Sequence, residues 1–262
     1  MTEFTELLAA VQRTDAGWTS TVSEDWLQGR TLYGGFSAAL CLNAALAAFE
    51  TLPPLRSAQL TFIGPATGAL TAVPTLLRQG KSAAYVGVDL TGDAGLAVRA
   101  VFTFGAARQS AFCESRMPAP EAPPPEACEP FFQLARPTFS QHFEAVSAGR
   151  ARPVTGATEP DYLVWLRHKD PAARSGILGL MALADATPPA AMAMFQAGAP
   201  ISTMTWMVDV LSDPDDLGAD GWLLLESRAE TVCEGYSAQP MAIWTRDGRP
   251  LVSARQCVAV FA

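Results

Sequence analysis

The sequence predicts an α+β fold made of two similar halves, in which two antiparallel sheets each wrap around a central apolar helix. Three observations predict this fold: a proline-rich segment near the middle of the 262-residue chain, the same order of one helix and four strands on either side of it, and an almost wholly apolar sequence in both helices. A helix that is apolar all round has to be enclosed, and a curved antiparallel sheet with one apolar face can enclose it.

The first half is predicted to begin with a short helix and a strand ahead of its apolar helix. Four strand-like runs follow, and the turns between them contain Gly64-Pro65, Gly80 and Gly92-Asp93. Because no helical pattern separates these runs, the sheet should be antiparallel. The expected elements are helix 4–11, strand 18–22, helix 35–49 and strands 55–63, 69–78, 83–90 and 96–104.

A single change of composition divides the chain. Six prolines lie between Met117 and Pro130, and proline both removes a backbone donor and holds the chain extended. We therefore expect an N-terminal unit over 1–110, a proline-rich linker over 111–134 and a C-terminal unit over 135–262.

The second half is predicted to repeat the first. A helix is expected to end before Pro188-Pro189, and four strands follow it. The expected elements are strands 138–147 and 161–167, helix 176–186, and strands 201–211, 222–232, 236–245 and 251–261.

Matching residues recur at a constant distance in the two halves. Gly80 and Gly235 are 155 residues apart, as are Leu96 and Leu251. This spacing, with the shared order of elements, indicates a duplication. The predicted architecture is that of a hotdog fold present twice in one chain, a double hotdog.

The composition excludes several classes of protein. With 49% hydrophobic and 17% charged residues the chain can bury a large core, and its net charge of −8 argues against a nucleic-acid-binding protein. The N-terminus lacks the basic start of a signal peptide, and the apolar run 35–49 is shorter than the ~20 residues of a membrane span. We therefore expect a cytoplasmic protein without a membrane span.

The metal-binding residue types are few. Five scattered cysteines without CxxC spacing fit a reducing compartment, and only His142 and His168 could supply imidazole ligands. We expect no metal and no cofactor, and we expect both histidines to be structural or surface residues instead of catalytic bases.

Four short segments, in their order and spacing, resemble the acyl-CoA thioesterase II type of double-hotdog protein, in its thioesterase-like branch. The resemblance spans nearly the whole chain outside the linker. The segments are Leu32-Tyr33-Gly34-Gly35-Phe36, Leu183-Ala184-Asp185-Ala186-Thr187-Pro188-Pro189, Thr203-Met204-Thr205 and Ser253-Ala254-Arg255-Gln256.

The resemblance implies a catalytic set made of Asp185, Thr203 and Gln256. Two positions depart from the better-known members: Thr205-Trp206 replaces an Asp-His pair, and Phe36 replaces a glutamine after the double glycine. These departures leave the implied catalytic residues in place, but they do not indicate which acyl group the substrate carries.

The chemistry needs an activated water and donors for the developing oxyanion. A carboxylate at Asp185 can accept a proton from water, the amide of Gln256 can orient that water, and the Thr203 hydroxyl can both donate and accept. The expected function is hydrolysis of an acyl-CoA to the free acid and coenzyme A, within fatty acid metabolism. The substrate-binding residues are expected to be Gly34, Gly35, Phe36 and Thr205, with the two glycine N–H groups holding the thioester oxygen or another anionic group.

Other interpretations of these residues stay open. Asp185 or Thr187 could cap a helix starting at Pro188. Thr205, on the same face as Thr203 by alternation, could supply the hydroxyl. Ser37 could be a nucleophile. Met181, Met192 and Met194 could line an acyl tunnel, and Arg78, Lys81, Arg228, Arg246 and Arg255 are candidates for the coenzyme A phosphates.

Two rival functions share the predicted fold, because a fold alone does not define a function. One is a non-catalytic binder of an acyl group or small ligand. The other is a hotdog hydratase or dehydratase, which would need a proton-shuttling histidine. In each case we expect a homodimer or a higher homo-oligomer, since such sheets expose a face or edge to a second copy.

Overall fold

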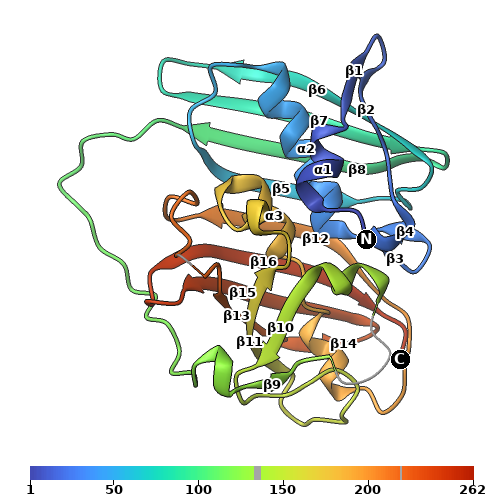
Figure 1. Ribbon diagram of the computed structural model, residues 1–262, viewed down its shortest axis with the longest axis vertical. Coiled ribbons are helices and arrows are strands. Elements are labelled where there is room, and N and C mark those ends of the chain that lie inside the picture. The colour runs from blue at the N-terminus through green and yellow to red at the C-terminus, as the bar shows by residue number, and fades with distance from the viewer. Residues whose placement is uncertain (133–136, 219) are drawn as a thin grey trace.

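A single antiparallel sheet runs through the computed structural model, which describes residues 1–132, 137–218 and 220–262 (Figure 1). Over these residues 14 strands form this sheet in the order β1-β2-β6-β7-β8-β5-β12-β16-β15-β13-β11-β10-β9, with β14 paired to β15. The short strands β3 and β4 make a separate hairpin.

The N-terminal half follows the predicted order. Its strand limits lie within two residues of the predicted ones, and the chain adds the short strand β1 and the β3–β4 hairpin. The elements are α1 (Phe4–Ala9), β1 (Gln12–Thr14), β2 (Gly17–Thr21), η1 (Glu24–Trp26), β3 (Leu27–Gln28), β4 (Thr31–Leu32), α2 (Gly34–Ala48), β5 (Leu55–Phe62), β6 (Ala69–Gln79), β7 (Ala83–Gly92) and β8 (Gly95–Gly105).

The C-terminal half has the same central plan. Its elements are η2 (Pro125–Ala127), β9 (Glu129–Pro130), η3 (Thr138–His142), β10 (Phe143–Ser147), β11 (Asp161–His168), η4 (Pro171–Ala173), α3 (Gly176–Leu183), η5 (Ala190–Met194), β12 (Ile201–Val210), β13 (Leu223–Arg228), β14 (Thr231–Cys233), β15 (Tyr236–Thr245) and β16 (Pro250–Val260). The strand order β2-β6-β7-β8-β5 in the N-terminal half corresponds to β11-β13-β15-β16-β12 in the C-terminal half. Along the sequence, α2 lies between β2 and β5, and α3 lies between β11 and β12.

Three details of the predicted elements are wrong. Residues 138–142 form a 3-10 helix, not a strand, because the Ser140 N–H and Oγ–H both donate to the Pro137 carbonyl. The run 222–232 is interrupted between β13 and β14. Helix α3 ends at Leu183, since the Ala186 N–H turns back to the Leu183 carbonyl.

The two predicted sheets are joined into one. Strand β5 pairs with β12 from Ser57 opposite Asp209 to Thr61 opposite Thr205. This pairing turns the predicted pair of separate sheets into one that continues from one half to the other, and it removes an open edge from each half.

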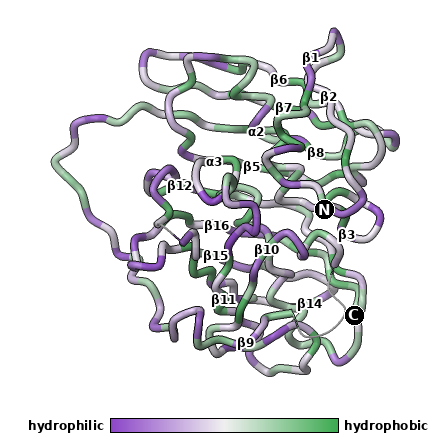
Figure 2. The backbone as a smooth tube through the Cα atoms, viewed as in Figure 1, coloured by the Kyte–Doolittle hydropathy of each residue, from purple (hydrophilic) through white to green (hydrophobic). Residues whose placement is uncertain are grey.

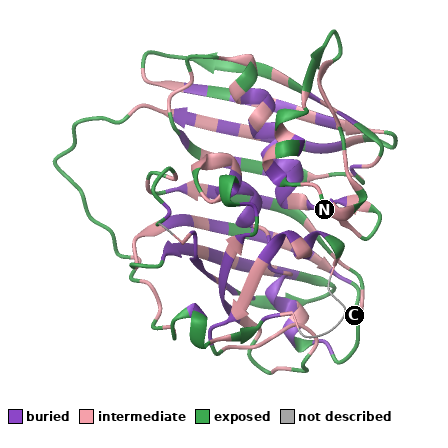
Figure 3. Ribbon diagram, viewed as in Figure 1, coloured by how far each residue is buried: buried purple, intermediate pink, exposed green. Residues whose placement is uncertain are grey.

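The apolar helices lie together on one face of this sheet (Figure 1). Helix α2 is buried on nearly every side and contacts β6, β7 and β8, whereas α3 contacts β11 and packs against α2 (Figure 3). Strands supply alternating buried residues, as in Val86, Val88 and Leu90 of β7. Hydrophobic residues follow the strands of both halves, and hydrophilic residues gather at the turns (Figure 2).

Segment 106–124 contains no helix or strand and is mostly exposed (Figure 3). It then lies against the C-terminal half, where the Trp244 and Trp165 indole N–H groups donate to the carbonyls of Met117 and Pro123 at 2.9 and 2.8 Å. The predicted boundaries of the two units stay predictions, and the end of the predicted linker and the start of the second unit lie outside the described residues.

No helix in the described ranges combines the length and the apolar character needed to cross a membrane.

Candidate functional site

A pocket of about 380 Å³ lies where the two halves meet. The N-terminal half contributes residues of the β3–β4 hairpin, the start of α2, β8 and the turn after β5, and the C-terminal half contributes the turn after α3 and the start of β12. The lining residues are Gln28, Thr31, Leu32, Gly34, Ser37, Phe62, Ile63, Gly64, Pro65, Ala66, Val98, Asp185, Thr187, Pro189, Ile201, Ser202 and Thr203.

Asp185 is the one acidic residue in this lining. It lies in the turn after α3, and its side chain faces the first turn of α2. The backbone N–H of Gly35 stabilises its ionised carboxylate, and Asp185 Oδ2 lies 2.6 Å from the point where a Cβ of Gly34 would be. The positive end of α2 therefore holds an anionic group of the protein itself, the Asp185 carboxylate.

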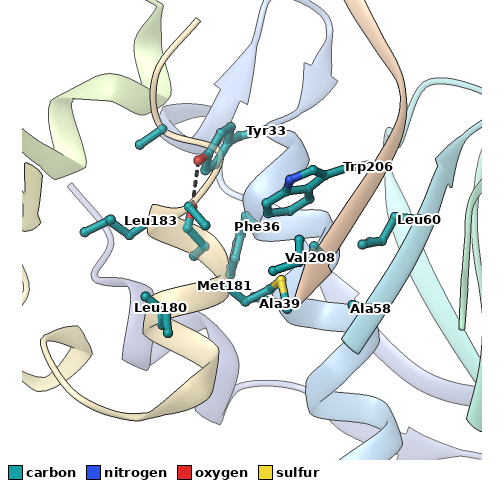
Figure 4. Close-up of a cluster of buried hydrophobic side chains, with 14 of the residues drawn as sticks. Tyr33, Phe36, Ala39, Ala58, Leu60, Leu180, Met181, Leu183, Trp206 and Val208 are labelled. Carbon is teal, nitrogen blue, oxygen red and sulfur yellow. Dashed lines mark hydrogen bonds between the residues drawn. The ribbon is translucent and has the colours of Figure 1, made fainter. Parts of the chain in front are cut away.

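The close approach of α2 to α3 depends on small residues. A Cβ at Gly35 would lie 2.4 Å from the Ala182 carbonyl oxygen and 2.6 Å from the Tyr33 hydroxyl. That hydroxyl donates to the Ala182 carbonyl at 2.6 Å across the junction of the halves (Figure 4). Glycine is needed here for space, which fixes Asp185 against the helix end.

Burial raises the pKa of Asp185 to about 7, even though hydrogen bonds from Gln256 and from the Gly35 N–H both lower it. The residue is half-buried, and its accessible part faces the pocket. Burial and the negative charge of Asp185 raise the pKa of Tyr33 well above its usual value, so Tyr33 stays protonated. A carboxyl group with a pKa near 7 is a proton acceptor suited to neutral pH.

Gln256 donates from Nε2 to Asp185 Oδ1 at 2.7 Å. Alternation along β16 places Ala254, Gln256 and Val258 on the buried face. The sequence did not indicate Gln239, which lies opposite Gln256 on β15 and donates from Nε2 to Gln256 Oε1 at 2.8 Å.

Gln239 is in turn held by the backbone of η5. Its Oε1 accepts a hydrogen bond from the Ala190 N–H at 2.9 Å. Both glutamine side chains are almost wholly buried. No short sequence motif links residues 185, 190, 239 and 256, so only the register of β15 and β16 could have revealed this chain of hydrogen bonds.

Thr203 lines the pocket, but Thr205 does not. The pairing of β12 with β16 shifts between them, so that Thr203 is opposite Val258 and Thr205 is opposite Cys257. Directly opposed residues share a face. The prediction that Thr203 and Thr205 share a face is therefore wrong, since this β-bulge turns Thr205 to the outer, exposed face.

Phe36 does not line the pocket. It is 1% exposed, and its ring lies 5.4 Å from that of Phe4 and 4.8 Å from that of Trp26. Helical geometry turns it away from Gly34 into this aromatic core, and Figure 4 shows its side chain among those of the buried hydrophobic cluster. The structure thus places Phe36 in the core instead of the pocket wall.

Thr187 is another hydroxyl residue of the pocket wall. It is 6% exposed, and its Oγ1 has no hydrogen-bond partner among the residues that the structure describes. The alternative interpretation, in which Asp185 or Thr187 caps a helix starting at Pro188, does not hold, because η5 begins at Ala190 with Pro189 at its N-cap and no side-chain cap.

The remaining candidates lie elsewhere or are engaged. The Ser37 hydroxyl donates to the Tyr33 carbonyl at 3.2 Å, and neither histidine lines the pocket. His168 donates from Nε2 to the Gly179 carbonyl at 2.9 Å, and burial lowers its pKa to about 4, whereas the ring of His142 stacks on that of Trp26 at 3.8 Å.

The predicted tunnel and phosphate residues also lie outside the pocket lining. Met181 is in the core and Met194 is exposed. Arg246 pairs with Glu126 and Asp220, and Arg255 pairs with Glu230. In the described ranges, no group of three or more His, Cys, Asp or Glu residues is placed to hold a metal ion.

Comparisons with known proteins agree on the fold. The chain is 23% identical, with a TM-score of 0.90, to a conserved protein of unknown function with a hot dog fold from Alicyclobacillus acidocaldarius, covering 99% of this chain and 98% of that one. It is 17% identical to the acyl-CoA thioesterase II TesB2 from Mycobacterium marinum, with a TM-score of 0.75 and 98% of both chains covered. For the tesB protein of Mycobacterium avium subs paratuberculosis the identity is 16%, the TM-score 0.77 and the coverage 99% and 98%.

These likenesses establish a hotdog fold. No curated protein sequence matches the chain. Two family models match it: the acyl-CoA thioesterase N-terminal domain over residues 22–105 and the acyl-CoA thioesterase C-terminal domain over residues 116–260. Since the second match alone covers more than half of the sequence, the chain belongs to the acyl-CoA thioesterase family.

Proposed function

We propose that this protein hydrolyses acyl-CoA thioesters to the free acid and coenzyme A, with Asp185 as the general base. The observation that carries the proposal is the Asp185 carboxyl group, which faces the pocket with its pKa raised to about 7 by burial and is held by Gln256 at 2.7 Å. A base with this pKa can take a proton from water at neutral pH and give it up again.

The proposed reaction needs no covalent intermediate. The oxygen of a water molecule attacks the thioester carbonyl carbon while Asp185 accepts one of its protons. The carbon–sulfur bond then breaks, and the leaving thiolate takes the proton back from Asp185. Gln256 keeps the carboxylate in place, because its amide N–H donates to Oδ1 and leaves Oδ2 on the side of Gly34.

Hydroxyl groups are the proposed partners of the thioester carbonyl. Thr203 lines the same pocket as Asp185, although no hydrogen bond joins it to Asp185 or Gln256 in the described residues. The unpartnered Thr187 hydroxyl is a second donor. The Gly35 N–H stabilises the ionised carboxylate of Asp185, so we assign it to holding the base instead of the thioester oxygen.

The apolar wall of the pocket supports an acyl group as the other part of the substrate. Phe62, Ile63, Val98 and Ile201 surround the space next to Asp185. Apolar walls with a few convergent polar groups are typical of small-molecule sites. The proposed partner is therefore an acyl-CoA.

The residues of the same pocket give less support to the two rival functions. A hydratase would need a proton-shuttling histidine, and both histidines lie outside the pocket lining. A non-catalytic binder would have no use for a carboxyl group with a pKa near 7 beside the ligand.

Thiol release from a panel of acyl-CoAs tests the proposal. We expect release well above background for at least one acyl group, and one oxygen-18 atom in the acid when the solvent is labelled water. Binding without release would support the binder, and water addition to an enoyl-CoA would support the hydratase; either result without hydrolysis would overturn the proposal.

A further inference from the structure

We propose that Gln239 is a positioning residue for the base, because it fixes which end of the Gln256 amide faces Asp185. This inference rests on the proposed function of Asp185. It stands on three hydrogen bonds that form one chain: Ala190 N–H to Gln239 Oε1 at 2.9 Å, Gln239 Nε2 to Gln256 Oε1 at 2.8 Å, and Gln256 Nε2 to Asp185 Oδ1 at 2.7 Å.

The direction of this chain is set at its far end. A backbone N–H can only donate, so the oxygen of Gln239 has to face Ala190. The Gln239 amide nitrogen then faces Gln256, and because it too can only donate, the oxygen of Gln256 has to face Gln239. The Gln256 nitrogen is left to donate to Asp185. One obligatory donor thus orients two amides that could otherwise rotate by half a turn.

Burial of both glutamines makes the opposite orientation of their amides unfavourable. Gln239 and Gln256 are 1% and 3% exposed, and they lie opposite each other on adjacent strands. A reversed amide would leave two donors or two acceptors facing each other without water to separate them, which is costly in the interior.

The chain favours the ionised form of Asp185. A protonated Asp185 would donate its O–H to an amide oxygen, but in this arrangement Gln256 presents a nitrogen. If Gln256 were free to rotate, its oxygen could accept that proton and stabilise the neutral acid. Among the described residues that couple to the charge of Asp185, the titratable one is Tyr33, which stays protonated.

Two substitutions break the chain at different places. Gln239→Met keeps the length of the side chain and removes both polar ends. Ala190→Pro removes the N–H that sets the direction and keeps both glutamine residues, but its ring Cδ takes the place of that hydrogen, so the Gln239 side chain has to turn away from residue 190. The backbone is compatible with proline there, because Ala190 is the first residue of η5 and Pro189 before it is already extended, with φ −53° and ψ 137°.

The control for the loss of a glutamine amide is Gln141→Met, at a partly buried position. Gln141 donates from Nε2 to the Asp25 carbonyl at 3.3 Å, and its side chain does not line the pocket. The same substitution at this position should leave Asp185 unaffected.

The decisive measurement is an NMR titration of the carbon-13 signal of the Asp185 carboxyl group, together with the pH profile of kcat/KM. For Gln239→Met and for Ala190→Pro we expect the pKa of Asp185 to rise by about 1, the acid limb of the profile to move with it, and kcat to fall roughly tenfold, in the range for a lost hydrogen bond to a charged group. KM should change little. The double variant should be no worse than the more affected single variant, since both changes act through one chain.

An unchanged pKa of Asp185 in both folded variants would overturn the proposal, even if kcat fell, because the loss would then be only structural. If Gln239→Met fails to fold, Ala190→Pro gives the same test. The NMR titration does not depend on turnover. If the protein hydrolysed no acyl-CoA, the proposed function would be refuted, but the titration would still show whether Gln239 affects the pKa of Asp185.

Discussion

At the scale of single residues, we expect removal of the Thr187 hydroxyl to lower activity and to raise stability. It is buried, has no partner among the described residues, and lines the pocket. We expect Thr187→Val to lower kcat/KM several-fold, because the thioester carbonyl loses a donor, and to raise the melting temperature, because a buried unpaired hydroxyl costs roughly 1–3 kcal/mol.

The matched control for this change is Ser227→Ala, which removes a buried, unpaired hydroxyl outside the pocket lining. It should raise the melting temperature and leave kcat/KM unchanged. Equal activity of Thr187→Val and the wild type would remove Thr187 from the site.

Asp185 also couples stability to pH. The pKa of this carboxyl rises from near 4 in the unfolded chain to about 7 in the folded protein, so between these values the unfolded chain has released the proton that the folded protein keeps. Ionisation of Asp185 therefore destabilises the fold progressively as pH rises from about 4 to about 7.

We expect Asp185→Asn to remove this dependence. The melting temperature of the variant relative to the wild type should increase from pH 4 to pH 8 and be constant below pH 4. Any fixed cost of the new amide next to the Gly35 N–H is the same at every pH and drops out of the comparison. A difference that does not change with pH would contradict the raised pKa.

At the scale of elements, the contact between α2 and the turn after α3 positions the base. A methyl group at Gly34 would lie 2.6 Å from Asp185 Oδ2. We expect Gly34→Ala to lower kcat/KM roughly tenfold or more, since small displacements of a catalytic group are costly. The free energy of unfolding should change little, because alanine favours a helix.

The control is Gly198→Ala, where a Cβ meets no atom within 4 Å. If the two variants had similar kcat/KM, the contact between α2 and Asp185 would not position the base.

The elements are also where prediction from sequence succeeded best. Alternating apolar residues and glycine turns placed the longer strands, most clearly β7 and β8, because one face of these two strands is buried along most of their length. The β3–β4 hairpin has two residues in each strand, which is too short for a periodic pattern. The bulge near Thr203 depends on pairing with β16, so alternation alone assigned Thr205 to the wrong face.

The site was predictable only in part for the same physical reason. The resemblance singled out Asp185 and Gln256, and the structure joins them with a hydrogen bond. Gln239 escaped notice because a polar residue on a strand is usually exposed, and only the register of β15 shows that it faces Gln256.

At the scale of the whole molecule, we expect the two halves to unfold together. Strands β5 and β12 are paired, α2 packs on α3, and Tyr33 bonds to Ala182 across the junction. Calorimetry should therefore give one transition, with equal calorimetric and van't Hoff enthalpies. Two separate transitions would show that the junction does not couple the halves.

The predicted self-association stays a prediction. Apolar side chains on the outer face of the sheet are exposed, among them Leu77, Tyr85 and Met207. A monomer in light scattering would contradict it.

The central claim is that Asp185 is the base that activates water, and the pH dependence of thiol release by the wild type and Asp185→Asn tests it most directly. We expect wild-type kcat/KM to rise with pH and to level off above about pH 7, as the carboxyl group ionises. The variant should remain folded and be at least about a hundredfold slower across the range, since a general base contributes roughly 10²–10⁴-fold. A folded variant that turns over acyl-CoA at the wild-type rate, with the same profile, would contradict the account.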